Sequence, residues 1–294
     1  MQKYLPWFLA IRPKTLAAAF VPVIGGSALG YVLGSQQIPW FIFICILCSI
    51  FALQAATNLF NDALDFQRGA DTLHRMGPTR VTQSKMLTER QVVSGGLACL
   101  ALAILFGIPI VLQGGWPYFV IGLLSCWGAY AYTGGRWALA YLGLGEIFVV
   151  LFFGWLATCG TYTLIVPGWP PAPVWIAGLQ IGLLATALLV VNNFRDREGD
   201  ARVGKKTLCV RWGHKFARFE IVFIYAVVYG LQPYWWKKGF GWAAVLPLMT
   251  SPLAVRVIAS LYRPPSSLLN KTLAKAAGIL LLFGIFFTTG LLLR

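Results

Sequence analysis

Long apolar runs separated by short polar segments make up almost the whole of this 294-residue chain. A helix needs about 20 consecutive, mostly apolar residues to cross a bilayer. Nine runs approach that length, and we expect spans at about 14–34, 38–62, 90–113, 116–133, 142–166, 173–194, 217–236, 240–262 and 271–293. The longest polar connections, at about 65–89 and 195–216, leave no room for a soluble domain. The pattern therefore predicts a single all-α integral membrane domain over residues 1–294, with nine transmembrane helices.

The composition agrees with this pattern, and the charge distribution adds an orientation. Apolar residues make up 58% of the chain and the mean hydropathy is +0.72. The net charge of +15 could suggest nucleic acid as a partner. With the N-terminus inside, however, 21 of the 24 Lys and Arg residues fall on the cytoplasmic side, and only Lys237, Lys238 and Arg294 fall outside. The positive-inside rule selects this orientation, so we expect a cytoplasmic N-terminus, an outer C-terminus and no nucleic-acid partner.

Acidic residues are scarce and clustered. The chain has nine, and six of them lie in two segments, Asn58–Asp71 and Asn192–Asp200. Each segment ends a predicted span that runs toward the cytoplasm, and the two are four helices apart. This repeat of position suggests two pseudo-related halves. Because carboxylates are costly to keep near hydrocarbon, their concentration here indicates function.

The spacing within each cluster places its polar residues on one side of a helix. Residues at i, i+3, i+4 and i+7 share a helical face. That spacing relates Asn58, Asn61, Asp62 and Asp65 in the first cluster, and Asn192, Asp196 and Asp200 in the second, with Asn193 beside them. We expect two polar stripes that face each other as an acidic mouth open to the cytoplasm.

Amide and carboxylate oxygens are hard ligands that suit Mg²⁺. The predicted metal ligands are Asn58, Asp62, Asp65, Asn192, Asp196 and Asp200. The four Asp residues of this set are also the predicted catalytic residues, and Asn61, Asp71 and Asn193 are further candidates.

Basic residues flank both clusters. Arg68, Arg80 and Lys205 lie closest to the acids and are predicted to bind phosphate oxygens. Topology alone explains most of the other Lys and Arg residues, so Lys14 is a weaker candidate. Metal-binding acids beside phosphate-binding cations, deep in an apolar chain, predict a metal-bound phosphorylated ligand with a lipid tail.

Glu146 and several aromatic residues are candidates for a cavity between the helices. Glu146 lies alone near the start of the fifth predicted span, where contact with a substrate and a hydrogen-bonded carboxyl within the bundle are equal alternatives. Tyr132 ends the fourth span on the same side and is a second candidate for this cavity. The aromatic residues placed to border a central cavity are Tyr130, Tyr132, Phe148, Phe152 and Trp155, although helix packing explains each equally well.

Several segments from the first span to the seventh carry a family resemblance. They include Asn58-x-x-Asn61-Asp62-x-x-Asp65, Gly77-Pro78-Thr79-Arg80, Tyr132-Thr133-Gly134 and Asn192-Asn193-x-Arg195-Asp196-x-x-x-Asp200. In these segments the chain resembles the UbiA-type membrane prenyltransferases. The resemblance implies nine helices around a central cavity with a lateral opening to lipid. It also implies transfer of a prenyl group from an allylic polyprenyl diphosphate to an aromatic acid, with Mg²⁺ as cofactor and Mn²⁺ as a substitute.

Within the family, the second acidic segment and the surroundings of Glu146 resemble the naphthoate branch of menaquinone biosynthesis in the bacterial inner membrane. That likeness implies 1,4-dihydroxy-2-naphthoate as acceptor, loss of its carboxylate and a demethylmenaquinol product. The wider family often has a third acid at the position of Gly69, whereas the next acid here is Asp71. Alternatives are another acceptor (4-hydroxybenzoate or homogentisate), a phytyl donor, or an ion-coupled transporter, whose sites usually lie nearer the membrane midplane.

Overall fold

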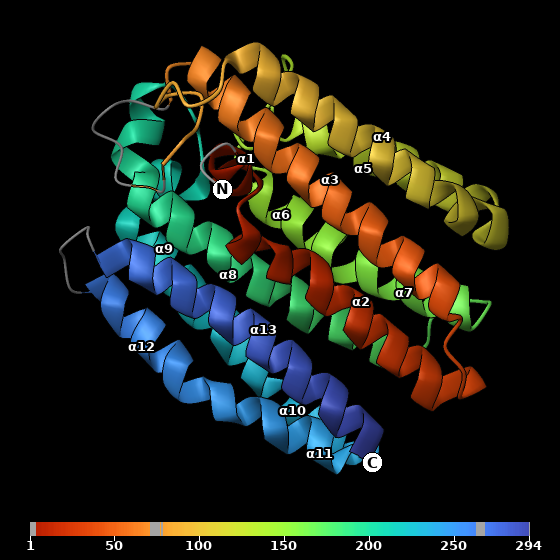
Figure 1. Cartoon of the computed structure of the whole chain (residues 1–294). Coiled ribbons are helices and arrows are strands. Elements are labelled where there is room, and N and C mark those ends of the chain that lie inside the picture. The colour runs from red at the N-terminus through yellow and green to blue at the C-terminus, as the bar shows by residue number, and fades with distance from the viewer. Residues whose placement is uncertain (1–3, 71–76, 78, 263–267, 294) are drawn as a thin grey trace.

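The fold is a bundle of long helices that lie side by side, with their connections gathered at the two ends (Figure 1). It is known from a computed structural model that describes residues 4–70, 77, 79–262 and 268–293, and these residues form helices and turns without a strand. The long helices are α2 (Leu16–Gly30), α3 (Trp40–Gln67), α4 (Glu89–Gly114), α5 (Trp116–Ala131), α8 (Ala172–Arg202), α9 (Leu208–Gly230), α12 (Ser251–Tyr262) and α13 (Leu269–Leu293). The shorter elements are α1 (Leu5–Ile11), η1 (Pro13–Thr15), η2 (Tyr31–Ser35), α6 (Gly145–Val149), η3 (Val150–Leu156), α7 (Ala157–Ile165), α10 (Gln232–Lys237), α11 (Gly241–Val245) and η4 (Leu246–Thr250).

Seven helical segments of the described chain are long and apolar enough to cross a membrane: 16–34, 40–67, 89–114, 145–165, 172–202, 241–262 and 269–293. Each coincides with a predicted span. The other two predicted spans are helical as well, but α5 has only 16 residues and α9 carries several charges, Lys215, Arg218 and Glu220 among them. The all-helical, multi-pass architecture is thus confirmed, whereas the count of nine spans stays a prediction.

The helices that carry the acidic clusters are longer than their apolar runs. The second predicted span stops at residue 62, but α3 continues to Gln67. The sixth stops at residue 194, but α8 continues to Arg202. The added part of α3 contains Asp65, and that of α8 contains Asp196 and Asp200, so these three carboxylates are held on regular helix backbone.

Helix α9 departs most from its predicted limits of 217–236. It begins at Leu208, where the Thr207 hydroxyl caps it by accepting a hydrogen bond from the Val210 amide. It bends at Gly213, whose φ of 81° is non-helical. It ends at Gly230, and Pro233 lies in the first turn of the short helix α10 that follows.

The fifth predicted span consists of α6, the π-helical turn η3 and α7, and η3 packs against α8. The backbones approach closely, because a Cβ on Gly182 would lie 2.9 Å from the Gly154 Cα atom. Small residues allow such approaches between membrane helices. The contact brings Glu146, at the start of α6, against the polar end of α8.

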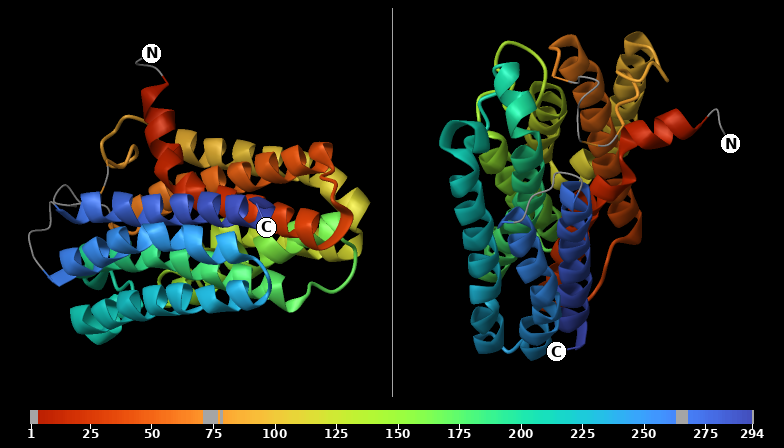
Figure 2. Two further views of the ribbon diagram at one scale, coloured as in Figure 1. Left: turned by 90° about the horizontal axis from the view of Figure 1, so that it is seen from below. Right: turned by 90° about the vertical axis from the view of Figure 1, so that its left-hand side faces the viewer.

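Other long helices pack against α7 and α8. Helix α2 packs on α3, α7 and α13, while α8 also packs on α9 and α13. The largest group of buried apolar side chains lies among α2, α8, α9 and α13. The short helix α1 instead projects away from the bundle in both views of Figure 2.

Candidate active site

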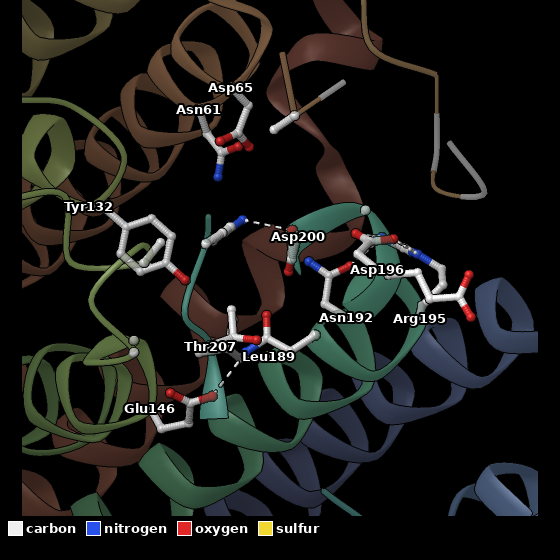
Figure 3. Close-up of a pocket in the computed structure, with 18 of the residues that line it drawn as sticks. Asn61, Asp65, Tyr132, Glu146, Leu189, Asn192, Arg195, Asp196, Asp200 and Thr207 are labelled. Carbon is white, nitrogen blue, oxygen red and sulfur yellow. Dashed lines mark hydrogen bonds and ion pairs between the residues drawn. The ribbon is translucent and has the colours of Figure 1, made fainter. Parts of the chain in front are cut away.

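A polar pocket of about 190 Å³ lies between the C-terminal parts of α3 and α8 (Figure 3). The two helices line the same pocket although more than a hundred residues separate them along the chain. Ten predicted site residues line the pocket: Asn61, Asp65, Arg80, Tyr132, Glu146, Asn192, Asn193, Asp196, Asp200 and Lys205. Both acidic segments and two of the predicted phosphate-binding residues therefore share one cavity.

The predicted polar stripe on α3 divides into two faces, which corrects the sequence-based expectation. Asn61 and Asp65 line the pocket, whereas Asn58 and Asp62 do not. The Asn58 amide donates to the Ile11 carbonyl oxygen at 2.7 Å and to the Thr15 hydroxyl at 3.0 Å. Within each pair the two residues are about one helical turn apart. The pair Asn58 and Asp62, however, faces the N-terminal segment and the loop before α4.

Asp62 fastens that loop to α3. Its side chain is 1% exposed, and its two oxygens accept hydrogen bonds from the amides of Val81 at 3.2 Å and Thr82 at 2.9 Å. Arg80 is the residue directly before this pair, so Asp62 fixes the backbone from which the Arg80 side chain enters the pocket.

Arg80 is buried and paired with the pocket-lining face of α3. It is 4% exposed, and its Nη2 atom lies 3.1 Å from Asp65 Oδ2 and 2.9 Å from Asn61 Oδ1. An ion pair removed from water is held only when its geometry and further hydrogen bonds compensate for lost hydration. The Asn61 contact supplies such a bond and aligns Asn61 with Asp65.

Tyr141, in the loop between α5 and α6, connects the two halves of the site. Its hydroxyl donates to Asp65 Oδ1 at 2.9 Å. Two cations lie over its ring: the Arg68 guanidinium is 4.3 Å from the ring centroid, and the Lys205 ammonium is 5.5 Å from it. Burial, and then the negative charge of Asp65, raise the pKa of the Tyr141 phenol, so the group remains a neutral donor.

Tyr141 gave no signal in the sequence, because it stands in an ordinary apolar stretch. Two of its contacts were predicted as phosphate-binding residues. Arg68 does not line the pocket and donates to the Gly135 carbonyl oxygen at 2.6 Å. Lys205 lines it, with its ammonium 3.6 Å from Asp200 Oδ1.

Arg195 is a second residue that sequence reasoning left without a role. Its guanidinium donates to both oxygens of Asp196 at 2.7 Å and also to Asn192 Oδ1. A further bond of 3.0 Å reaches Asn270 Oδ1 on α13. Figure 3 shows Arg195 beside Asp196 at the edge of the pocket. Arg195 thereby fixes the oxygens of two pocket-lining side chains, Asn192 and Asp196, and connects them to α13.

Glu146 and Tyr132 lie on the side of the pocket that leads into the bundle. The buried Glu146 carboxylate accepts a hydrogen bond of 2.9 Å from the Asn193 amide. Tyr132 lines both the polar pocket and a larger apolar cavity of about 500 Å³. It therefore stands where the polar and apolar spaces meet.

The apolar cavity extends between α2, α3, α4, α5, η3 and α7. Phe148 and Phe152 line it and stack with ring centroids 5.3 Å apart. Tyr130 and Trp155, also predicted to border a central space, do not line it. Tyr130 packs edge-on against Phe60, and the Trp155 indole donates to the Trp175 carbonyl oxygen.

The donor set of the polar pocket fits a hard cation that is shared with a substrate. Within the described residues, no three His, Cys, Asp or Glu side chains are close enough to hold a metal ion by themselves. The pocket nevertheless offers oxygens from α3 (Asn61 and Asp65) and from α8 (Asn192, Asp196 and Asp200). Mg²⁺ commonly binds through one or two carboxylates, waters and substrate phosphates, rather than in an all-protein cage. Two predicted residues fall outside this description: Asp71 entirely, and Lys14 by its side chain.

Comparison with known proteins identifies the family. The model of the UbiA prenyltransferase family matches residues 19–283. The chain belongs to the UbiA prenyltransferase family. It is accordingly a multi-pass membrane prenyltransferase, as the motifs predicted.

Individual relatives and one solved structure agree with the family assignment. The 1,4-dihydroxy-2-naphthoate octaprenyltransferase of Haemophilus influenzae is 31% identical over 99% of this chain and 97% of its own length. The protein of the same name from Escherichia coli is 35% identical over 72% of this chain and 70% of its own length. A UbiA homolog from Archaeoglobus fulgidus bound to GPP and Mg²⁺ superposes with a TM-score of 0.65 at 18% identity, over 97% of this chain and 99% of that one. This last likeness shows that the two proteins have the same fold.

Proposed function

We propose that this enzyme transfers a polyprenyl group from an allylic polyprenyl diphosphate to 1,4-dihydroxy-2-naphthoate, with loss of the acceptor's carboxylate and dependence on Mg²⁺. The observation that carries the proposal is the position of Tyr132, which lines both a polar pocket with acids and cations and a large apolar cavity. A diphosphate with a hydrocarbon tail requires both environments side by side. The names of the relatives, and the GPP and Mg²⁺ bound to the Archaeoglobus homolog, support donor and metal.

The proposed metal ligands are the oxygens that line the pocket: Asn61, Asp65, Asn192, Asp196 and Asp200. Asn58 and Asp62, predicted as ligands from spacing, are assigned to holding the backbone around them. When bound, Mg²⁺ or Mn²⁺ neutralises charge that grows on the departing diphosphate.

The chain's own residues bind and shield the donor. Arg80 and Lys205 line the pocket and are proposed to contact phosphate oxygens. Arg68 approaches the same Tyr141 ring as Lys205 and adds positive charge there. The apolar cavity holds the tail and excludes water from the allylic carbon as its bond to oxygen breaks, and the stacked rings of Phe148 and Phe152 stabilise positive charge there.

The acceptor is proposed to bind between Tyr132 and Glu146. Both line the pocket, and Asn193 holds the Glu146 carboxylate in place. Hydrogen bonds from these groups to the acceptor's hydroxyls would turn its carboxyl-bearing carbon toward the allylic end of the donor. A carbon–carbon bond forms there while the donor's carbon–oxygen bond breaks and diphosphate leaves. Carbon dioxide then departs, and its bonding electron pair restores the aromatic ring.

The proposed topology has nine spans in one domain over residues 1–294. It adds α5 and α9 to the seven segments that meet the length and hydropathy of a membrane span. The charge distribution favours a cytoplasmic N-terminus and pocket, and an outer C-terminus, in the bacterial cytoplasmic membrane. A cytoplasmic pocket suits a charged donor made in the cytosol.

A test of this function is product analysis with an acceptor panel. Purified protein, Mg²⁺ and a polyprenyl diphosphate are incubated with 1,4-dihydroxy-2-naphthoate, 4-hydroxybenzoate or homogentisate, and products are identified by mass. We expect a prenylated, decarboxylated naphthalenediol from the first acceptor at a rate at least tenfold above the others. Preferential prenylation of 4-hydroxybenzoate or homogentisate would contradict the proposed acceptor.

A further inference from the structure

Tyr141 is placed to organise both functions of the proposed site without lining the pocket. It belongs to neither acidic helix, since it lies in the loop between α5 and α6. Its hydroxyl binds one oxygen of Asp65, and Arg80 binds the other. A carboxylate offers about four lone-pair positions, so these two contacts fix its orientation and leave positions free for a cation in the pocket.

The ring of Tyr141 brings together cations from the two halves of the protein. Arg68 follows directly after α3, and Lys205 lies in the loop after α8. Both charged groups approach the same ring, at 4.3 and 5.5 Å from its centroid. An aromatic face attracts a cation within about 6 Å, and it thus offsets the repulsion between two positive side chains gathered at one place.

The position of Tyr141 is fixed by its backbone. Its carbonyl oxygen accepts a hydrogen bond of 3.0 Å from the Lys206 amide. Arg211 spans the same two loops and donates to the carbonyl oxygens of Leu142 and Lys206. At Gly143, where φ is 70°, a Cβ would lie 2.5 Å from the Lys206 oxygen, so the loops approach as closely as glycine permits. The loop of Tyr141 is therefore bound to the loop that carries Lys205.

We propose that Tyr141 is a positioning residue with two separable actions: its hydroxyl orients Asp65 for the metal, and its ring holds Arg68 and Lys205 for the diphosphate. The proposal rests on the proposed function, which makes the pocket a site for a metal-bound diphosphate. Because one residue carries both actions, substitutions that keep or remove the ring should separate them.

The test uses purified full-length variants and binding of inorganic pyrophosphate, measured by calorimetry over a range of Mg²⁺ concentrations. Tyr141→Phe keeps the ring and removes the hydroxyl. The Mg²⁺ concentration for half-maximal pyrophosphate binding should rise about five- to tenfold, as expected for the loss of one hydrogen bond. Pyrophosphate affinity at saturating Mg²⁺ should stay within about twofold of wild type.

Tyr141→Leu removes ring and hydroxyl together. It should show the same change in metal requirement and, in addition, a pyrophosphate affinity at saturating Mg²⁺ that is lower by about five- to thirtyfold, from two lost cation–π contacts. Tyr141→Met is a second ring-free variant should the Leu variant fail to fold. Tyr130→Phe is the matched control, because Tyr130 lies outside both cavities and should bind as wild type in both measurements.

Equal pyrophosphate affinity of the Phe variant and the ring-free variants at saturating Mg²⁺ would overturn the role of the ring. An unchanged metal requirement in Tyr141→Phe would overturn the role of the hydroxyl. The wild-type protein separates this proposal from the proposed function: Mg²⁺-dependent pyrophosphate binding without prenylation of any acceptor would refute the function alone. A wild type that binds no pyrophosphate with Mg²⁺ would refute both.

Discussion

The substitution Asp62→Asn tests whether Asp62 binds the metal or holds the loop before α4. Asp62 was a predicted metal ligand, but in the structure it contacts that loop. Both of its oxygens accept backbone hydrogen bonds from the loop before α4, at Val81 and Thr82. An asparagine fits the same space but presents one oxygen and one NH₂ group. The NH₂ group would face a backbone donor, so one hydrogen bond is lost and the other loses its charge.

The size of the effect follows from these contacts. A hydrogen bond to a charged group contributes about 1.5–3 kcal/mol, against about 0.5–1.5 kcal/mol for a neutral one. The substitution should therefore weaken the attachment of the Arg80–Thr82 segment by roughly 2–4 kcal/mol. That corresponds to roughly a 30- to 1,000-fold shift toward the detached segment. Arg80 moves with this backbone, so donor binding should suffer while the pocket-lining oxygens of α3 remain in place.

Two measurements check the result. Hydrogen exchange should be faster at the amides of Val81 and Thr82, which lose their acceptor. Steady-state kinetics should show the KM for the polyprenyl diphosphate raised at least tenfold, with the Mg²⁺ concentration for half-maximal rate within about twofold of wild type. Asp65→Asn is the comparison variant and should instead raise the Mg²⁺ requirement. If Asp62→Asn raised the Mg²⁺ requirement as much as Asp65→Asn, while exchange stayed slow, Asp62 would be a metal ligand and this reasoning would be refuted.

Three further outcomes are expected. Gly182→Leu should force η3 away from α8 and lower the free energy of unfolding by about 1–3 kcal/mol, measured by thermal unfolding of the detergent-solubilised protein. Gly278→Leu is the control, because a Cβ at Gly278 meets nothing within 4 Å, and it should not lower this free energy. Equal Tm values of the two variants would contradict the close packing. Arg195→Leu should lower turnover at least a hundredfold, because it removes the two hydrogen bonds that Arg195 donates to the Asp196 carboxylate. Asn270→Leu removes one contact of Arg195 and should lower turnover about tenfold or less; equal turnover of both variants would show that Arg195 does not orient Asp196. Excess chelator should abolish turnover, and added Mg²⁺ or Mn²⁺ should restore it; turnover that persists in chelator would exclude a metal role.

The sequence predicted the helical bundle well, because hydrophobic run length is itself the physical requirement for crossing a bilayer. It misplaced the ends of α3 and α8, where polar residues continue the helix past the apolar core. The length of an apolar run predicts only the part of a helix that crosses the hydrocarbon layer. Where a helix continues beyond this layer to carry a polar site, the apolar run does not show where the helix ends.

The candidate site was predictable as two acidic segments but not residue by residue. Asn58 and Asp62 have the same chemistry and the same four-residue spacing as Asn61 and Asp65, and only the surrounding segments decide which pair lines the pocket. Tyr141 was missed because its importance lies in a contact with a residue far away in sequence, Asp65, which no local pattern contains. Arg195 was missed although it contacts the nearby Asn192 and Asp196, because topology alone explains an Arg at this position.

A double-label experiment tests the central claim that the polar pocket and the apolar cavity serve decarboxylating prenyl transfer. Purified enzyme receives a polyprenyl diphosphate labelled in the prenyl group and 1,4-dihydroxy-2-naphthoate labelled in the carboxyl group. We expect one labelled carbon dioxide for each prenylated product, only with Mg²⁺ present. At a limiting Mg²⁺ concentration, Asp65→Asn and Asp200→Asn should lower the yields of product and carbon dioxide equally. A prenylated product that retains its carboxyl label, or carbon dioxide released without donor, would contradict the proposed reaction.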